Sequence, residues 1–240
     1  YGMLTEDKFY DKAESFNLYP TVDDKYFTYE ELEKKIKKLQ TDKDGNLIIL
    51  YAQNKDEQYT YIESAKEKGY EVLLLDSPII PHLMQKLESK KEKIKFSRVD
   101  SDTLENLIKK DEEVISKLTD EEKEKLKPMI ETAVENEKYT VQLEALDSNS
   151  MPFMLAQPEF MRRMKEMQQS GGGAMGNLPD MYSLIVNTNH ELVGKILNTR
   201  TEKKRNSLIK QSIDLAKLSQ NNLTGKDLTE FINRSIDLIK

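Results

Sequence analysis

The hydrophobic positions between residues 47 and 99 form short continuous runs rather than helical repeats. LIILY and YEVLLLD are apolar runs of strand length, and QYTYIESAKEKG between them has helical spacing and ends at Gly69. A strand, a helix and a strand in this order predict a βαβ crossover whose parallel strands are buried on both faces. IKFSRVD predicts a further strand, so we expect a small layered α/β unit here.

Helical patterns lie on both sides of this unit. Residues 1–40 predict helices, the second of which starts at a capping box formed by Thr28 and Glu31. Thr119 and Glu122 form the same pattern within a densely charged helical stretch. We interpret the charges of that stretch as a solvated helix face.

The second half of the chain contains both the two-residue alternation of strands and the helical repeat. TVQLEAL and MYSLIV alternate apolar and polar positions as half-buried strands do, and NTNHELVGKIL predicts a strand end followed by a capped short helix. Two amphipathic helices follow, near 202–219 and 225–239. The sequence therefore predicts an α/β domain over residues 1–110 and a mixed α+β domain over residues 111–240 that ends in two helices.

Methionine is concentrated in one stretch of the chain. Six of the ten methionines fall between residues 151 and 176, beside a glycine run at 171–173. Within residues 151–168 we expect a short amphipathic helix with an apolar side and a charged side. The apolar side holds Phe160, Met161, Met164 and Met167, and the charged side holds Arg162, Arg163, Lys165 and Glu166.

Two interpretations of this apolar side are open. A methionine stripe at helical spacing commonly packs in a core. Methionine is also frequent on surfaces that bind many partners, because its unbranched thioether adapts to many shapes, and a glycine-rich tether suits a helix that moves. We therefore expect a partly exposed, mobile binding helix. A helix that binds signal sequences or a membrane surface is a weaker alternative, since the apolar side is short and the chain is acidic.

Composition narrows the possible partners. The formal net charge is −6, which disfavours nucleic acid and anionic membranes, because binding to either needs a positive field. The chain has no cysteine, which excludes disulfides and cysteine-ligated zinc. No apolar run reaches the roughly 18 residues of a transmembrane helix. The first residue is Tyr1, so we interpret the chain as part of a longer protein.

Catalytic and cofactor motifs are missing from the sequence. No GxGxxG follows the first strand and no GxxxxGK[ST] occurs, so the βαβ unit does not predict a nucleotide site. We expect His82 near the start of a helix and His190 in a packing or capping role, because neither has metal-ligand spacing. We therefore expect no catalytic, cofactor-binding or metal-binding residue and no enzyme activity. The alternative is an α/β enzyme fragment with a substrate site on the βαβ unit.

Three stretches together resemble the heat shock protein 90 family of chaperones. YGMLTEDKFYDKA followed by KYFTYEEL resembles the late part of that family's middle domain, and KEKGYEVLLLDSPIIPHLMQKL resembles its small α/β unit. VNTNHELVGKIL resembles the Asn-x-x-His-x-Leu-Val signature of its C-terminal domain. The resemblance covers nearly the whole chain. It favours the bacterial type, since no acidic co-chaperone tail follows Lys240.

The resemblance implies functions that the residues alone do not show. Members of the family are cytoplasmic, ATP-driven chaperones whose ATP and magnesium site lies in an N-terminal domain that this chain does not contain. The arginine that assists hydrolysis would also lie upstream. The resemblance further implies a mobile amphipathic helix that contacts unfolded or partly folded client proteins. The corresponding residues here are Phe160, Met161, Met164 and Met167, with Met151 and Met154.

The resemblance also implies that the last two helices form a four-helix bundle with those of a second copy. Both helices carry an apolar stripe, and Thr224 with Asp227 marks the start of the second one. Client proteins and a second copy are thus the expected partners, with no nucleic acid and no membrane. The expected homodimer contact includes Leu208, Ile209, Ile213, Leu215 and Ala216 from the first helix and Leu228, Phe231, Ile232 and Ile239 from the second.

Overall fold

The computed structural model describes residues 2–111, 114–134, 138–171 and 181–239. The chain divides into two compact units. The first is formed by Tyr1–Asp111 with Glu159–Leu178 and the second by Glu112–Pro158 with Pro179–Lys240. Helix α8 (Glu159–Gly171) therefore belongs to the first unit, whereas the sequence analysis assigned it to the second domain.

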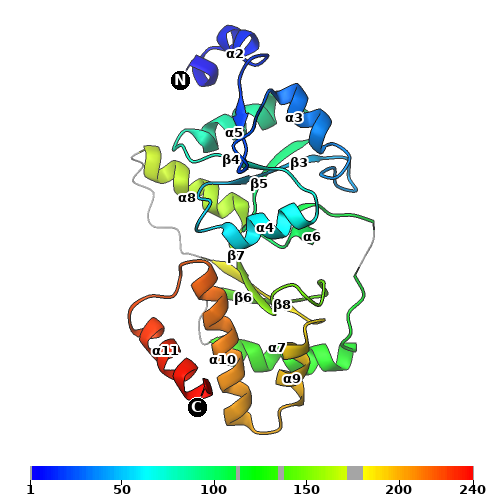
Figure 1. Ribbon diagram of the computed structural model, residues 1–240, viewed down its shortest axis with the longest axis vertical. Coiled ribbons are helices and arrows are strands. Elements are labelled where there is room, and N and C mark those ends of the chain that lie inside the picture. The colour runs from blue at the N-terminus through cyan, green and yellow to red at the C-terminus, as the bar shows by residue number, and fades with distance from the viewer. Residues whose placement is uncertain (1, 112–113, 135–137, 172–180, 240) are drawn as a thin grey trace. The chain divides into compact units, whose positions relative to one another are not determined.

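A three-stranded parallel sheet forms the centre of the first unit (Figure 1). Its middle strand is β3 (Leu47–Ala52), and its edges are β4 (Val72–Leu74) and β5 (Ile94–Arg98). Helix α4 (Tyr59–Glu67) connects β3 to β4, and helix α5 (Ile80–Lys90) connects β4 to β5. The predicted βαβ crossover is therefore confirmed, and a second crossover follows it.

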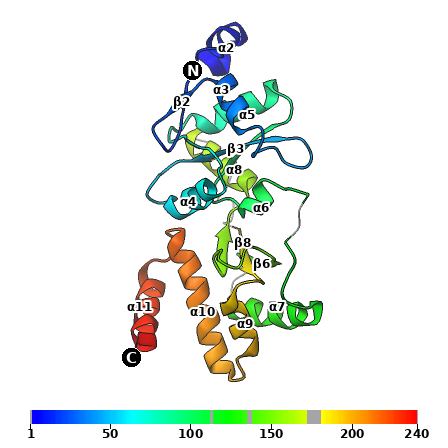
Figure 2. The same ribbon diagram turned by 45° about the vertical axis from the view of Figure 1, so that its right-hand side comes forward.

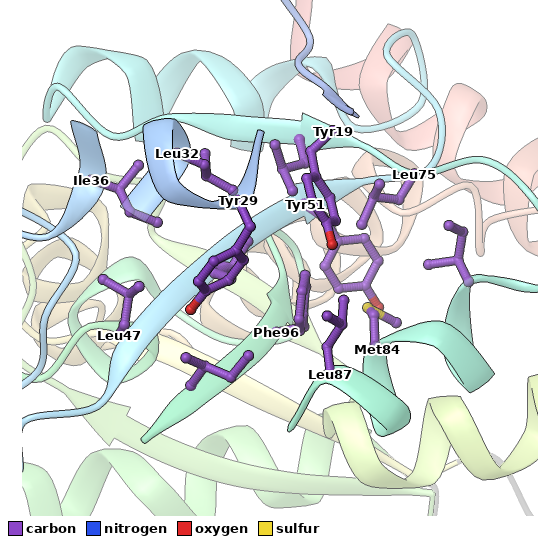
Figure 3. Close-up of a cluster of buried hydrophobic side chains, with 14 of the residues drawn as sticks. Tyr19, Tyr29, Leu32, Ile36, Leu47, Tyr51, Leu75, Met84, Leu87 and Phe96 are labelled. Carbon is purple, nitrogen blue, oxygen red and sulfur yellow. The ribbon is translucent and has the colours of Figure 1, made fainter. Parts of the chain in front are cut away.

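All residues of β3 are buried, which explains why its sequence is a continuous apolar run. Successive side chains point to opposite faces, and Leu47, Ile49 and Tyr51 pack with helix α3 (Tyr29–Ile36) and helix α5. Figure 3 shows this core. Its labelled members are Tyr19, Tyr29, Leu32, Ile36, Leu47, Tyr51, Leu75, Met84, Leu87 and Phe96.

Short elements and a helix cap complete the first unit. The short elements are α1 (Gly2–Thr5), α2 (Asp7–Ala13), β1 (Tyr19–Pro20), β2 (Tyr26–Phe27) and α6 (Leu104–Leu107). The capping box predicted at the start of α3 is confirmed. The Thr28 N–H donates to the Glu31 carboxylate at 2.9 Å, and the Glu31 N–H donates to Thr28 Oγ1 at 3.4 Å.

The second unit contains a mixed sheet of β6 (Tyr139–Glu144), β7 (Phe153–Ala156) and β8 (Tyr182–Asn187). Strand β8 lies in the middle, parallel to β6 and antiparallel to β7. Strands β6 and β8 are the two that the alternating pattern predicted. Residues 153–156 are a strand rather than the beginning of the methionine-rich helix, because Pro158 disfavours helical backbone at the residue before it. The helix begins only at Glu159.

Helices cover one face of this mixed sheet and build the core of the second unit. They are α7 (Asp120–Val134), α9 (Glu191–Asn198) and α10 (Glu202–Ser219), and a further helix, α11 (Gly225–Ile239), lies beside α10 (Figure 2). Leu184 and Val186 of β8 pack in this core with Ile209 of α10. The predicted capping box before α7 is confirmed by a 2.9 Å bond from the Thr119 N–H to the Glu122 carboxylate.

Polar contacts attach α11 to α10. Arg234 pairs with the carboxylate of Asp214, which is only 3% exposed, and Gln211 Nε2 donates to Ser235 Oγ at 2.8 Å. Among the α11 residues whose exposure is described, none is fully buried, so this helix adds little to the core. No helix in the described part of the chain is long and apolar enough to cross a membrane.

Candidate functional site

Helix α8 exposes much of its apolar side and buries much of its charged side. Phe160 is 70% exposed and Met164 is 40% exposed, whereas Arg162 is only 3% exposed. Met161 and Met167 are half-buried. Most amphipathic helices on a protein surface have the reverse arrangement, with the apolar stripe facing the core. The sequence analysis identified the two sides of the helix but did not predict that the charged side would be the buried one.

The charged side of α8 covers the free edge of strand β5. An edge strand has backbone N–H and C=O groups that no neighbouring strand satisfies. Here the Arg98 N–H donates to Glu159 Oε2 at 3.2 Å, and the Phe96 carbonyl accepts from Arg163 Nη2 at 2.6 Å. The Phe96 N–H donates to Glu88 of α5 at 2.7 Å. Side chains of two helices thus replace the missing strand.

Glu159 lies at the centre of this contact. Its Oε1 atom accepts hydrogen bonds from the Tyr51 hydroxyl at 2.7 Å, from Arg162 Nη2 at 2.6 Å and from Arg163 Nε at 2.7 Å. The Arg162 guanidinium also donates to the Tyr51 hydroxyl and to Glu166. Taken singly, hydrogen bonds that involve charged groups are about twice as strong as neutral ones, and their geometry is more specific.

Further ion pairs extend the contact across the first unit. The two terminal nitrogens of Arg163 pair with both carboxylate oxygens of Glu88, at 2.8 and 3.2 Å. Arg98 Nε pairs with Asp100 at 2.5 Å, and Arg98 Nη1 donates to Gln53 at 2.9 Å. We call the whole group the α8 charge cluster. Its members are Glu88, Arg98, Asp100, Glu159, Arg162, Arg163 and Glu166.

The charges of the cluster stabilise one another in a buried place. Burial by itself would raise the pKa of Glu159, but the Arg162 and Arg163 guanidinium groups outweigh it, so the pKa of that carboxyl lies below its usual 4.5. Burial, together with the charge of Glu159, raises the pKa of the Tyr51 hydroxyl above its usual 10.0. Near neutral pH, Glu159 is therefore ionised and Tyr51 is a neutral donor.

A sequence signal for this buried side exists in the spacing of opposite charges. Glu159 precedes Arg162 and Arg163 by three and four residues, and Glu166 follows Arg162 by four. Such pairs are common on solvated helices, where each contributes only about 0.2–0.5 kcal/mol. The spacing alone therefore could not show that the charges would be buried against β5.

Two of the residues expected to contact clients lie outside α8. Met154 belongs to β7 of the second unit, where it is half-buried and packs against Leu146, Ala156 and Ile185. Met151 precedes the same strand and is also half-buried. The structure therefore brings Phe160, Met161, Met164 and Met167 together on one helix but does not place Met151 and Met154 on it.

The residues expected at the dimer contact divide into two groups on α10. Ile209, Ile213 and Ala216 are 0–4% exposed and pack in the core of the second unit, so their assignment to a dimer surface is corrected. They are buried because they cover the apolar face of β8. Leu208 packs against the same core in a half-buried position. Leu215 is 44% exposed and remains available.

The expected dimer residues of α11 remain open to a partner. Ile232 is 47% exposed and Ile239 is 86% exposed, while Leu228 and Phe231 are half-buried. The sequence analysis did not include Ile236, which is also 47% exposed and lies one turn from Ile232. These side chains give α11 an apolar stripe that the second unit does not cover.

The Asn-Thr-Asn-His stretch that carried part of the family resemblance has a structural role. His190 Nδ1 accepts from the Leu192 N–H at 3.1 Å, which confirms the expected cap at the start of α9. Asn189 Oδ1 accepts from the Lys117 N–H at 2.7 Å, and its Nδ2 donates to the Leu146 carbonyl at 3.0 Å. The stretch therefore fastens two loops to the end of β8. His82 lies near the start of α5, as expected.

A hollow on the first unit is relevant to the alternative function, an enzyme fragment with a substrate site on the βαβ unit. It is lined by charged residues of both signs, such as Glu33 and Lys91, and by Leu47 and Ile94. The last two residues begin β3 and β5, whereas ligands of parallel α/β sheets bind beyond the carboxyl ends of the strands. Within the described residues, no group of three or more His, Asp or Glu side chains is arranged to hold a metal ion. This hollow does not support a substrate site.

Comparisons with characterised proteins identify relatives. No protein-family model matches the chain. The chain is 37% identical to Chaperone protein HtpG of Bacteroides thetaiotaomicron over 308 aligned positions, which include 100% of the chain and 45% of the relative. It is 40% identical to Chaperone protein HtpG of Porphyromonas gingivalis over 223 positions, which include 91% of the chain and 33% of the relative.

These matches, together with the confirmed α/β and α+β fold, show that the chain belongs to the heat shock protein 90 family of chaperones. Within that family, it corresponds to part of an HtpG-type chaperone. The chain spans less than half the length of the curated relatives that it matches.

Proposed function

We propose that this chain provides a client-binding surface and a dimer contact for an ATP-dependent chaperone of the HtpG type. The observation that carries the proposal is the burial pattern of α8, which hides Arg162 while it exposes Phe160 and Met164. Exposed apolar side chains grouped on one helix mark interaction sites. Unfolded proteins offer many apolar shapes, and methionine adapts to such variety.

The experiment for client binding replaces the two most exposed apolar residues of α8. Each side chain buried against a client could contribute about 1–2 kcal/mol, less the entropy of ordering it. We expect Phe160→Ser with Met164→Ser to reduce the suppression of aggregation of an unfolded model protein, while the melting curve stays unchanged. Tyr59→Ser is the control, since Tyr59 is 62% exposed on another helix of the same unit. Unchanged suppression, or a lost melting transition, would contradict the proposal.

The proposed dimer contact is the exposed apolar surface of α10 and α11. Leu215, Ile232, Ile236 and Ile239 would be covered by the same helices of a second copy in a two-fold arrangement. We expect light scattering to give the mass of a dimer at concentrations of about 10 μM and above. Ile232→Asp should weaken the dimer, whereas Asn233→Asp, which adds the same charge at the next exposed position, should not.

ATP is proposed to act from a part of the full-length chaperone outside this chain. No GxGxxG follows the first strand of the βαβ unit, and no GxxxxGK[ST] occurs in the sequence. Isothermal titration of the chain with ATP and magnesium should therefore give no heat of binding. A micromolar dissociation constant would contradict this proposal and would support the enzyme alternative.

A further inference from the structure

The two sides of α8 can be occupied at the same time. Glu159, Arg162 and Arg163 contact the first unit, while Phe160 and Met164 remain open on the other side of the helix. We propose that Glu159, Arg162 and Arg163 are positioning residues that keep α8 on the edge of β5 while a client is bound. The inference rests on the proposed function for the nature of the ligand. It replaces a helix that moves freely with one that is held in place.

The contacts of these residues fix both the position and the rotation of the helix. Glu159 and its neighbours reach three different elements: Tyr51 on β3, Phe96 and Arg98 on β5, and Glu88 on α5. A slide of one helical turn, about 5.4 Å, would break all of these bonds. The best-established role of buried, hydrogen-bonded charges is to select one alignment of two packed elements among several possible alignments. Apolar contacts alone would tolerate rolling, because the hydrophobic effect has no direction.

Positioning matters because α8 is too short to be stable by itself. The helix has 13 residues, and isolated helices of up to about 15 residues are marginal in water. A client that bound a released α8 would therefore have to order the helix as well. If only a tenth of the molecules held the helix in its binding form, the apparent affinity would fall about tenfold. Docking on β5 removes this loss before the client arrives.

The unchanged protein provides the first test. The Arg98 N–H is bonded to Glu159, so its hydrogen exchange reports whether α8 is docked. The probe is carboxymethylated α-lactalbumin, which stays unfolded. We expect the exchange of the Arg98 N–H to be no faster when the chain is saturated with the probe. An acceleration of about tenfold or more would show that the client releases α8, and it would overturn the inference.

A double variant provides the second test. Glu159→Gln with Arg163→Gln removes two charges of the cluster and leaves Phe160 and Met164 unchanged. We expect faster exchange of the Arg98 N–H and an affinity for the probe about tenfold lower. Arg163→Lys keeps the charge and should retain part of both properties, since it loses only the forked geometry. The control is Glu131→Gln, which breaks the exposed Lys127–Glu131 pair of α7 and should change neither property.

The outcomes separate this inference from the proposed function. A double variant that keeps the Arg98 N–H protected, or that releases α8 yet binds the probe as tightly as before, would overturn the positioning role. Phe160→Ser with Met164→Ser should have the opposite profile, with weak probe binding and a protected Arg98 N–H. If the unchanged chain bound no probe, the proposed function would fail. The exchange rates of the unchanged chain and the double variant would then decide only whether Glu159 and Arg163 hold α8 on β5 in the free chain.

Discussion

Helices α8 and α10 are both amphipathic, yet they bury opposite sides. Helix α10 packs Ile209, Ile213 and Ala216 into the core of the second unit, as an amphipathic pattern normally indicates. Helix α8 buries Arg162 and leaves Phe160 exposed. The difference comes from the surface that each helix covers. Helix α10 covers the apolar side chains of a sheet face, whereas α8 covers a strand edge, where the groups to be satisfied are backbone N–H and C=O.

The contact of α10 with its core and the contact of α8 with β5 also differ in their free energy and in how strongly that free energy depends on geometry. Burying an Ile or Leu side chain stabilises a fold by about 1.5–3 kcal/mol, with little dependence on geometry. A buried ion pair is much less favourable on balance, because removing its charges from water opposes their attraction. We therefore expect α10 to be inseparable from the stability of its unit, and α8 to be held in one orientation by a contact that smaller changes can release.

The largest expected effect concerns α10, the helix that packs in the core, and is a loss of free energy of unfolding. Ile213→Asp would place a charge in a position that is 4% exposed and would remove a buried apolar side chain. We expect the second unit to lose about 4 kcal/mol or more of its free energy of unfolding. Phe160→Asp is the matched change on α8 and should leave the free energy of unfolding within about 0.5 kcal/mol, because Phe160 is exposed. Denaturant unfolding measures both, and equal losses would refute the comparison.

How far the sequence predicted these structures depended on the kind of contact. The parallel strands and the capping boxes could be predicted from local patterns. An apolar run such as LIILY indicates a buried strand, and a Thr28–Glu31 pair indicates a capping box, without reference to distant residues. Strand β7 was missed because four apolar residues suit a strand or a helix equally. The buried side of α8 was missed because its partners, Tyr51 and Glu88, are far away in the sequence. The exposed part of α10 could not be separated from its core part for the same reason.

Acid should release α8 before it affects α10. The pKa of Glu159 is lowered in the folded chain, so its contribution is complete above 4.5 and is lost as the pH falls through the lower, folded value. Protonation leaves Arg162 and Arg163 without the negative charge of their shared carboxylate, so the docked position of α8 becomes less stable.

The chain has no cysteine, so a single nitroxide label can report on each helix. We expect a label at Met164→Cys to become mobile below pH 4.5 while a label at Leu218→Cys on α10 stays ordered. Both labels becoming mobile at the same pH would indicate general unfolding and would count against a separate release of α8.

The smallest expected effect concerns one hydroxyl group. Tyr51→Phe removes the donor to Glu159 but keeps the ring, above which the Arg162 guanidinium carbon lies at 5.6 Å from the ring centre. We expect a loss of about 2 kcal/mol in the free energy of unfolding of the first unit, because the hydroxyl donates to Glu159 and accepts from Arg162, and hydrogen bonds to charged groups are worth more than neutral ones. Tyr10→Phe is the matched control in the same core, because the Tyr10 hydroxyl is buried without a hydrogen-bond partner among the described residues. Removing that hydroxyl should be neutral or slightly stabilising. If the two variants lost equal stability in denaturant unfolding, the loss at Tyr51 would come from core packing, and the hydrogen bond to Glu159 would contribute nothing to holding α8.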